Sequence, residues 1–276
     1  MRKFLGRMTR RGIVALLAGL LVTLPLGVNA AKDQSPVLAQ IAKWGKIRIG
    51  MSGGQPPYNV VSREGKLIGM DVDIAELLAK SLDVQLELVQ MNFNELLPAL
   101  EAGKVDLVIS GMTATIQRNM RAAFVGPYHI TGKSILTRSE TIAALGSNDL
   151  NRDDLRIAAL KGSTSEDFVR RVAPNAKVVA SDTYDDAIDQ LLSNKAELFV
   201  ADASIIMLSM MRWPDAGLTA AQRPLTIEPI GIAVPASDPL LLNLVENYMT
   251  ALESSGALEK LEEKWFKSGG WLVQLP

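Results

Sequence analysis

Short β-rich runs alternate with amphipathic helical stretches twice along the chain, and no other feature constrains the fold as strongly. The β-rich runs are residues 46–50, 84–89, 105–109, 156–160, 177–180 and 198–200. The helical stretches between them are residues 71–82, 94–102, 165–172 and 184–192. Strands that alternate with helices in this way form parallel sheets, because each helix returns the chain to the edge where the strand began. We therefore expect an α/β fold with two lobes of similar design.

A local repeat supports the likeness of the two lobes. Residues 99–109 and 190–200 both read as the end of a helix, a tight turn, a lysine, an acidic residue and an apolar strand. Chance similarity between α/β units is the alternative explanation for a single match of this kind. Together with the alternation of strands and helices, the repeat favours two related lobes.

Several residues mark the predicted helix ends. Asp71 precedes an apolar helical face and is expected to cap the helix over 71–82. Gly103 is expected to end the helix over 94–102. The pair Asp238-Pro239 opens a long helix, since proline is well tolerated at the first helical position.

Two further β-rich stretches, residues 130–137 and 227–234, are placed where the chain could cross between the lobes. Two crossings would make the first lobe discontinuous in sequence. We expect lobe 1 to comprise residues 31–129 and 229–276, and lobe 2 to comprise residues 130–228.

The first thirty residues are typical of a secretory signal peptide. The basic residues of this segment are Arg2, Lys3, Arg7, Arg10 and Arg11. An apolar stretch follows over residues 12–28, and the small-residue pattern Val28-Asn29-Ala30 ends it. An uncleaved membrane anchor is the alternative, and Pro25 favours cleavage. The paired arginines also resemble a twin-arginine signal, although such pairs occur in many basic heads.

Composition narrows the compartment and the partners. The whole chain has a formal charge of −1, and residues 1–30 hold five basic and no acidic residues, so the remainder carries −6. Such a chain is a poor candidate for binding nucleic acid. With 0 Cys, it has neither disulfides nor a cysteine for lipid attachment. We expect a monomer, free in a Gram-negative periplasm, with no cofactor.

Polar residues cluster where predicted strands end, which is where open α/β sheets bind their ligands. They are Ser110, Gly111, Thr113, Arg118, Ser163, Thr164 and Asp202. A carboxylate needs a guanidinium and oriented N–H groups, while an ammonium needs a carboxylate and neutral acceptors. These residue types therefore suit an amino acid. Taken singly, Arg118 could be a surface charge and Asp202 a helix cap.

The chain resembles the polar amino-acid-binding proteins of bacterial ABC uptake systems, solute-binding family 3. The resemblance lies in residues 65–75, 97–100, 103–115, 118, 124–128, 161–164, 201–202 and 265–266. It implies a Venus-flytrap fold, a free amino acid as ligand and an ABC permease as partner. It also implies that Arg118 holds the α-carboxylate with Thr113 and the Thr164 amide. By the same resemblance, Asp202 holds the α-ammonium with Thr113 and the Ser110 carbonyl.

The selectivity positions depart from the family pattern. The family commonly has an acidic residue near the position of Ser52 and an aromatic residue near that of Gln55. Leu160 and Ala201 stand where some relatives place polar or charged selectors. Phe93 is either an aromatic wall of the site or a core residue. Without the acid near Ser52, we expect a ligand with an uncharged side chain.

Two other functions compete with transport. The same fold includes periplasmic cyclohexadienyl dehydratases, which use an acidic residue near the ammonium-binding Asp. The segment from Asp202 to Met207 has no second carboxylate. His129 reads as a linker residue, and no catalytic triad or metal-ligand cluster is visible. We therefore expect no enzyme. A sensory module that presents the same pocket to a kinase or chemoreceptor is the other alternative.

Overall fold

The structure is a computed structural model that describes residues 35–275. The predicted signal peptide over residues 1–30 lies outside the described residues. Within the described part of the chain, no helix is both long enough and apolar enough to cross a lipid bilayer.

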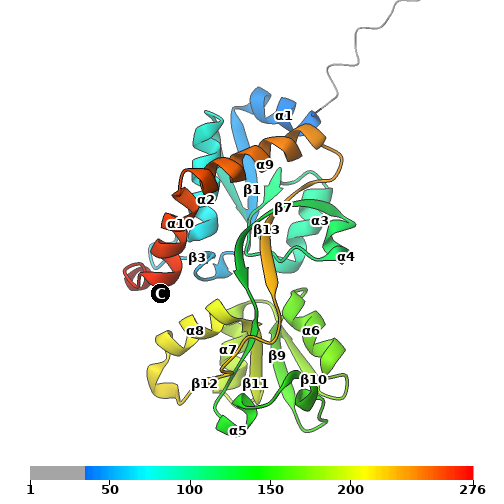
Figure 1. The fold of residues 1–276 in the computed structure, drawn as a ribbon, viewed down its shortest axis with the longest axis vertical. Helices are drawn as coiled ribbons and strands as arrows, with labels where there is room; N and C mark the ends of the chain where they lie inside the picture. The colour runs from blue at the N-terminus through cyan, green and yellow to red at the C-terminus, as the bar shows by residue number, and fades with distance from the viewer. Residues whose placement is uncertain (1–34, 276) are drawn as a thin grey trace, which may run out of the picture. The chain divides into compact units, whose positions relative to one another are not determined.

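The first lobe is built on a five-stranded mixed sheet (Figure 1). Its strands, in spatial order, are β5 (Gln85–Gln90), β1 (Lys46–Met51), β6 (Leu107–Val108), β13 (Glu228–Pro235) and β7 (Ala122–Thr131). The strands β5, β1 and β6 run parallel, whereas β13 is antiparallel to both of its neighbours. The helices of this lobe are α1 (Pro36–Trp44), α2 (Met70–Ser81), α3 (Leu96–Glu101), α4 (Ile116–Asn119), α9 (Pro239–Ser254) and α10 (Ala257–Glu262). A small sheet joins β2 (Gly54–Gln55), β3 (Asn59–Val61) and β4 (Leu67–Ile68).

The second lobe repeats the design with its own five-stranded sheet. Its strands, in spatial order, are β10 (Lys177–Ser181), β9 (Arg156–Leu160), β11 (Leu198–Asp202), β8 (Lys133–Thr137) and β12 (Thr219–Ala220). The strands β10, β9 and β11 are parallel, and β8 runs antiparallel to β11. The helices are α5 (Glu140–Ala143), α6 (Thr164–Val172), α7 (Tyr184–Leu192) and α8 (Ala203–Arg212). The two-lobed α/β architecture expected from the sequence is confirmed.

The chain passes between the lobes along β7 and β13. Strand β7 leaves the first sheet and continues into β8 of the second, and β13 returns to the first sheet (Figure 1). The two strands pair from Ala122↔Pro235 to Thr131↔Glu228. The first sheet is therefore assembled from segments on both sides of the second lobe. The exact lobe boundaries given above stay a prediction.

Local structure departs from the sequence-based expectations at two places. Asp71 does not cap α2, because the helix begins one residue earlier with Gly69 at the capping position and no side-chain cap bond. The carboxylate of Asp71 is instead buried and bound by residues from other elements. The strand expected over 105–109 is shorter, because the Asp106 carboxylate takes the Arg48 main-chain N–H (2.8 Å) that a strand carbonyl would otherwise bind.

The C-terminal segment is fixed to the first lobe by packing and by hydrogen bonds. Trp265 and Trp271 are buried with ring centroids 5.3 Å apart, and the Trp271 indole N–H donates to the Trp265 carbonyl at 3.0 Å. The guanidinium of Arg63 donates twice to the Leu275 carbonyl, at 3.0 and 2.8 Å. The segment after α10 is therefore part of the lobe core.

Removing the Trp271 side chain should destabilise the protein. We expect Trp271→Ala to lower the free energy of unfolding by about 3–5 kcal/mol, because large aromatic groups leave a cavity when truncated in a core. Urea denaturation checks this. The control is Val273→Ala, two residues away and 71% exposed, which should change stability by less than about 0.5 kcal/mol. Equal effects of the two substitutions would contradict the packing role.

Candidate functional site

Arg118 links the two lobes at the ends of their parallel strands. It lies on α4, whose N-cap Thr115 accepts a hydrogen bond from the Arg118 N–H. Its guanidinium donates to the Thr113 carbonyl (2.9 Å) and, across to lobe 2, to the Gly162 carbonyl (3.2 Å). Burial lowers the pKa of Arg118, but a guanidinium stays charged in proteins. Other donors of its fork remain for an incoming carboxylate.

The start of α6 stands beside Arg118, as the sequence predicted. Ser163 caps the helix, and its hydroxyl accepts from the N–H groups of Ser165 and Glu166. The hydroxyl of Thr164 is 3.4 Å from that of Thr113 in lobe 1. Gly162 has a φ of +70°, and a Cβ there would be 2.8 Å from the Cβ of Asn94. Glycine thus permits the close approach of the lobes at this point.

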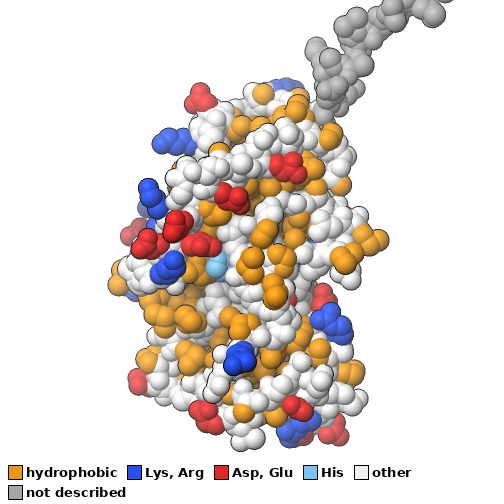
Figure 2. Space-filling view, viewed as in Figure 1, with side chains coloured by type: hydrophobic (Ala, Val, Ile, Leu, Met, Phe, Trp, Pro, Cys, Tyr) orange, Lys and Arg blue, Asp and Glu red, His pale blue; other side chains and the backbone are white. Residues whose placement is uncertain are grey.

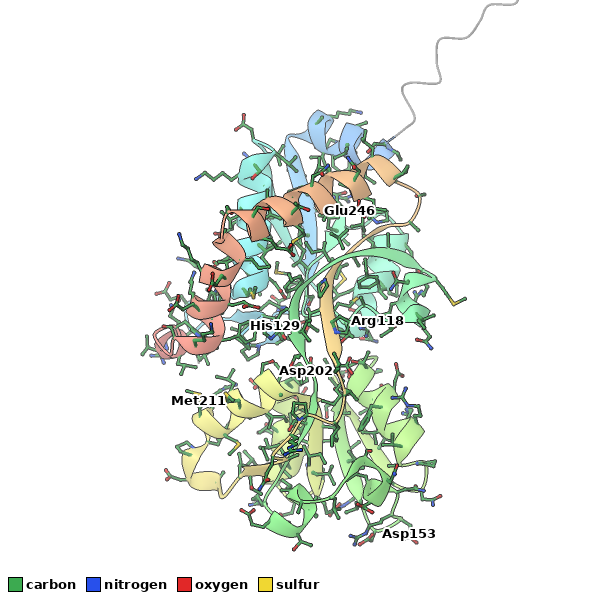
Figure 3. All side chains as sticks on the ribbon, viewed as in Figure 1. Arg118, His129, Asp153, Asp202, Met211 and Glu246 are labelled. Carbon is green, nitrogen blue, oxygen red and sulfur yellow. The ribbon has the colours of Figure 1, made fainter. Side chains whose placement is uncertain are left out.

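Asp202 lies where the two lobes meet, on the side of lobe 2 (Figure 3). It occupies the N-cap position of α8 but makes no capping bond with its side chain. Its Oδ1 instead accepts a hydrogen bond from the buried Lys133 ammonium at 2.6 Å. Lys133 was not predicted from the sequence, because only the antiparallel register of β8 with β11 brings it opposite Asp202.

Ser52, Gln55 and Ser110 form a buried polar wall on lobe 1. The hydroxyls of Ser52 and Ser110 lie 3.0 and 3.2 Å from the Gln55 side-chain carbonyl, and the Ser52 N–H donates to the Ser110 hydroxyl at 3.0 Å. Asn59 extends the network, since its Oδ1 accepts from the Gly53 N–H at 2.7 Å. The structure thus brings these predicted ligand-binding residues together, bonded to one another.

Gly111 is held by a second buried network behind this wall. The Tyr128 hydroxyl accepts from the Gly111 N–H (3.2 Å) and donates to Asp71 Oδ1 (2.7 Å). Asn59 donates to the other oxygen of Asp71 at 2.7 Å. Burial raises the pKa of Asp71 from its ordinary value of 3.8 to about 6, and these hydrogen bonds limit the rise. The titratable carboxyl of Asp71 therefore supports the main chain at Gly111 through Tyr128.

A small pocket is lined by residues of both lobes. Its lining residues are Ser52, Gly54, Gln55, Asn92, Phe93, Leu160, Asp182 and Thr183. Its volume is about 30 Å³, which leaves room for water but not for an amino acid. Phe93 faces this pocket and also lies under Arg118, whose guanidinium carbon is 5.4 Å from the ring centroid. Phe93 and Leu160 thus both line this pocket.

Three residues of this region escaped the sequence reading. Asp182 and Thr183 line the pocket, and Tyr184 follows as the first residue of α7. Burial and the nearby Asp202 carboxylate raise the pKa of Tyr184, while a hydrogen bond to Gln55 lowers it. All three stand just past β10. Their position at the end of a strand is the sequence signal that predicts them, because open α/β sheets bind ligands at strand ends.

His129 packs at the crossover, away from the polar groups of the cleft. Its ring stacks on Phe266 with centroids 4.1 Å apart, and its Nδ1 is 3.2 Å from a Glu262 carboxylate oxygen. Burial lowers the pKa of His129. It is visible as the pale blue group at the level where the lobes meet (Figure 2). This packing agrees with its interpretation as a linker residue.

The protein is two-lobed and α/β, with the Arg118 guanidinium of lobe 1 and the Asp202 carboxylate of lobe 2 near the place where the lobes meet. The model of the bacterial extracellular solute-binding proteins, family 3, matches residues 47–268. The chain belongs to this family, as its sequence motifs indicated.

Relatives within this family include both transport components and an enzyme. The ABC transporter arginine-binding protein 1 of Escherichia coli K12 is 25% identical over 257 residues, covering 91% of this chain and 98% of that protein. The cyclohexadienyl dehydratase of Pseudomonas aeruginosa is 25% identical over 258 residues, covering 93% and 95%. A crystal structure of a mutant of ArgBP from T. maritima is 32% identical with a TM-score of 0.79, covering 84% of this chain and all (100%) of that one.

The raised pKa of Asp71 predicts a pH-dependent stability difference between wild type and Asp71→Asn. Because the folded protein holds the Asp71 proton more tightly than the unfolded chain, this group stabilises the fold fully below pH 3.8. That stabilisation is lost as the pH rises to about 6. The stability of the wild type relative to Asp71→Asn should therefore fall by about 3 kcal/mol over this window.

Urea denaturation at pH 4, 5, 6 and 7 (about one-unit steps that span the transition) measures this difference. Asp153→Asn, at an exposed position, is the control and should run parallel to the wild type. Parallel curves for Asp71→Asn as well would contradict the assignment.

Proposed function

We propose that the protein captures a free α-amino acid between its lobes and delivers it to an ABC permease. Arg118 binds the α-carboxylate with the Thr113 hydroxyl and the Thr164 N–H, and Asp202 binds the α-ammonium with the Ser110 carbonyl. The observation that carries the proposal is the placement of Arg118 and Asp202, opposite charges from different lobes, near the junction of the lobes (Figure 3). A zwitterion is the smallest ligand that complements both.

Such a ligand would drive closure of the lobes. A molecule that contacts both lobes stabilises the arrangement in which both contacts exist. The lobes already touch through Arg118 and Gly162, which line a pocket of about 260 Å³, whereas the pocket lined by Ser52, Gln55 and Leu160 holds about 30 Å³. In this proposal the lobes separate to admit an amino acid to the smaller pocket and close again around it.

The ligand's side chain is polar and uncharged in this proposal. Asp182 is the one charged residue that lines the side-chain pocket, and its carboxylate is 3.7 Å from the Lys161 ammonium. The remaining polar lining offers hydroxyl and amide groups. Relatives named as arginine-binding proteins make arginine the competitor that must be tested.

The cellular setting follows from family membership and the N-terminal sequence. The family consists of bacterial extracellular solute-binding proteins, and the relative from Escherichia coli is named as part of an ABC transporter. We propose export through the signal peptide at residues 1–30, a periplasmic location and action as a monomer. Lobe 1 would comprise residues 31–129 and 229–276, and lobe 2 residues 130–228.

Catalysis is the second candidate, because a relative is named as a cyclohexadienyl dehydratase. No acid follows Asp202 on α8, but Glu228 lies near it in space, with both carboxylates within reach of Lys133. Glu228 accepts from Thr226 at 2.8 Å and faces Lys133, which leaves it poorly suited to donate a proton. Incubation with prephenate or arogenate should therefore give no product; turnover would establish the enzyme.

Substitution of either charged residue should abolish tight binding. We expect Arg118→Ala and Asp202→Asn each to weaken amino-acid binding by about 100-fold or more, since each leaves one charge of a desolvated zwitterion unpaired. Isothermal titration calorimetry with the standard amino acids measures this. Asp153→Ala, at an exposed position far from the cleft in Figure 3, is the control. Unchanged affinity in either cleft variant would refute its role.

Ligand choice can be tested through Asp182. We expect glutamine or another uncharged polar amino acid to bind more tightly than arginine. Asp182→Asn should change the affinity for the uncharged ligand by less than about threefold, because the carboxylate is already paired and exposed. Calorimetry on both proteins decides this. Tighter binding of arginine, reduced about tenfold or more in Asp182→Asn, would instead establish a cationic ligand.

A further inference from the structure

Asp202 belongs to a buried cluster of three charged residues. Lys133 on β8 places its ammonium 2.6 Å from Asp202 and 3.5 Å from Glu228 on β13. The exposed fractions of the three side chains are 2% for Lys133, 4% for Asp202 and 10% for Glu228. Neither Lys133 nor Glu228 was among the residues that the sequence singled out.

The cluster also joins the two crossover strands. The Lys133 N–H donates to the Thr226 hydroxyl at 2.9 Å, and this hydroxyl donates to Glu228 at 2.8 Å. The Leu225 N–H donates to the Lys133 carbonyl at 2.7 Å. Lys133 is therefore held in place by the second crossover and does not depend on a bound ligand for its position.

The formal charge of the cluster is −1, because two carboxylates share one ammonium. Uncompensated charge in a buried site is costly, and a cation that reaches it is strongly attracted. Only Oδ1 of Asp202 is bonded to Lys133, so Oδ2 remains for another donor. The field of Glu228 extends across the cleft, since Glu228 is among the charges that act on Arg118 and Tyr184.

We propose that Lys133 and Glu228 are positioning residues that make the site demand an ammonium group. Lys133 orients Asp202 and cancels one carboxylate, and Glu228 restores the net negative charge that the ammonium of the ligand neutralises. This inference rests on the proposed amino-acid binding. It explains how the site would distinguish an amino acid from a carboxylic acid of the same shape that lacks the ammonium.

Counting charges gives distinct expectations for each variant. Glu228→Gln leaves the cluster neutral, so the ammonium of the ligand is no longer required. Lys133→Met leaves two buried carboxylates without a counter-charge. The double variant Lys133→Met with Glu228→Gln returns the cluster to −1, now carried by Asp202 alone.

The test compares two probes by calorimetry. One is the amino acid that binds most tightly in the titration series, and the other is the α-hydroxy acid with the same side chain, which lacks the ammonium. The dissociation constant of the hydroxy acid divided by that of the amino acid is the ratio that measures selectivity for the ammonium. A purely structural defect weakens both probes alike and leaves this ratio unchanged.

We expect Glu228→Gln to lower the ratio by about tenfold or more relative to the wild type. The double variant should recover at least part of this loss, which the coupling in a double-mutant cycle reports. Glu246→Gln on α9, far from the cleft in Figure 3, is the matched control and should retain the wild-type ratio. Thermal melting confirms that each variant is folded, and if Lys133→Met alone does not fold, Glu228→Gln and the double variant still decide.

The outcomes separate the two proposals. An unchanged ratio in Glu228→Gln, with tight amino-acid binding retained in the wild type, overturns the role of the cluster and leaves the proposed function intact. A ratio in the double variant no higher than in Glu228→Gln also overturns it. Failure of the wild type to bind any amino acid overturns the proposed function, and the role of the cluster with it.

Discussion

The antiparallel pair of β7 and β13 joins the two lobes and also holds the loop over residues 112–114 in place. Beyond the ladder between these strands, Thr113 forms a bridge with Ile230, the Ala114 N–H donates to the Pro229 carbonyl at 2.8 Å, and the Gly231 N–H donates to the Met112 carbonyl at 3.0 Å. The loop that carries Thr113 and leads into Arg118 is thus bonded directly to the returning crossover. Any change in the strand pair would move Thr113 and Arg118 with it.

The charged groups of the cleft follow from the same arrangement. An ionised group that loses its water needs a partner of opposite charge or several hydrogen bonds. Arg118 has two carbonyls and the face of Phe93, and Lys133 has two carboxylates. What remains is unneutralised positive charge on lobe 1 and negative charge on lobe 2. In the proposed function a zwitterion supplies both missing partners at once, which neither an amine nor a carboxylic acid can do.

The sequence predicted those parts of the molecule that depend on local pattern. Strand β9 and helix α7 begin and end where their periodicity indicated, and Arg118 and Thr113 were found because strand ends are visible in a sequence. Lys133 could not be found in this way. It meets Asp202 through an antiparallel register between strands 69 residues apart, and no local pattern records that pairing.

Asp71 shows the opposite failure. Its position before an apolar face favoured a helix cap, which is the usual use of an aspartate there. The Tyr128 hydroxyl, 57 positions later in the chain, binds its carboxylate instead. The hydrogen bond from the distant Tyr128 thus outweighs the local preference of an aspartate for the helix cap. The same limit applies to Gln55 and Ser110, whose hydrogen bond arises only when β2 and the end of β6 come together.

These bonds bear on how selectivity could differ between relatives. On lobe 1, Ser52, Gln55 and Ser110 satisfy one another in a buried network, so replacing one leaves the others with unmatched polar atoms, which is costly. On lobe 2, Asp182 and Thr183 line the same pocket and are exposed; Asp182 pairs with the exposed Lys161, and Thr183 caps α7 by accepting from the Asp186 N–H at 3.0 Å. Loss of the Thr183 cap destabilises α7, whereas substitution of Asp182 breaks only an exposed ion pair and costs the fold little. The position of Asp182 on lobe 2 is therefore where ligand preference changes most easily without loss of stability, although the selectivity positions predicted from the sequence lie mainly on lobe 1.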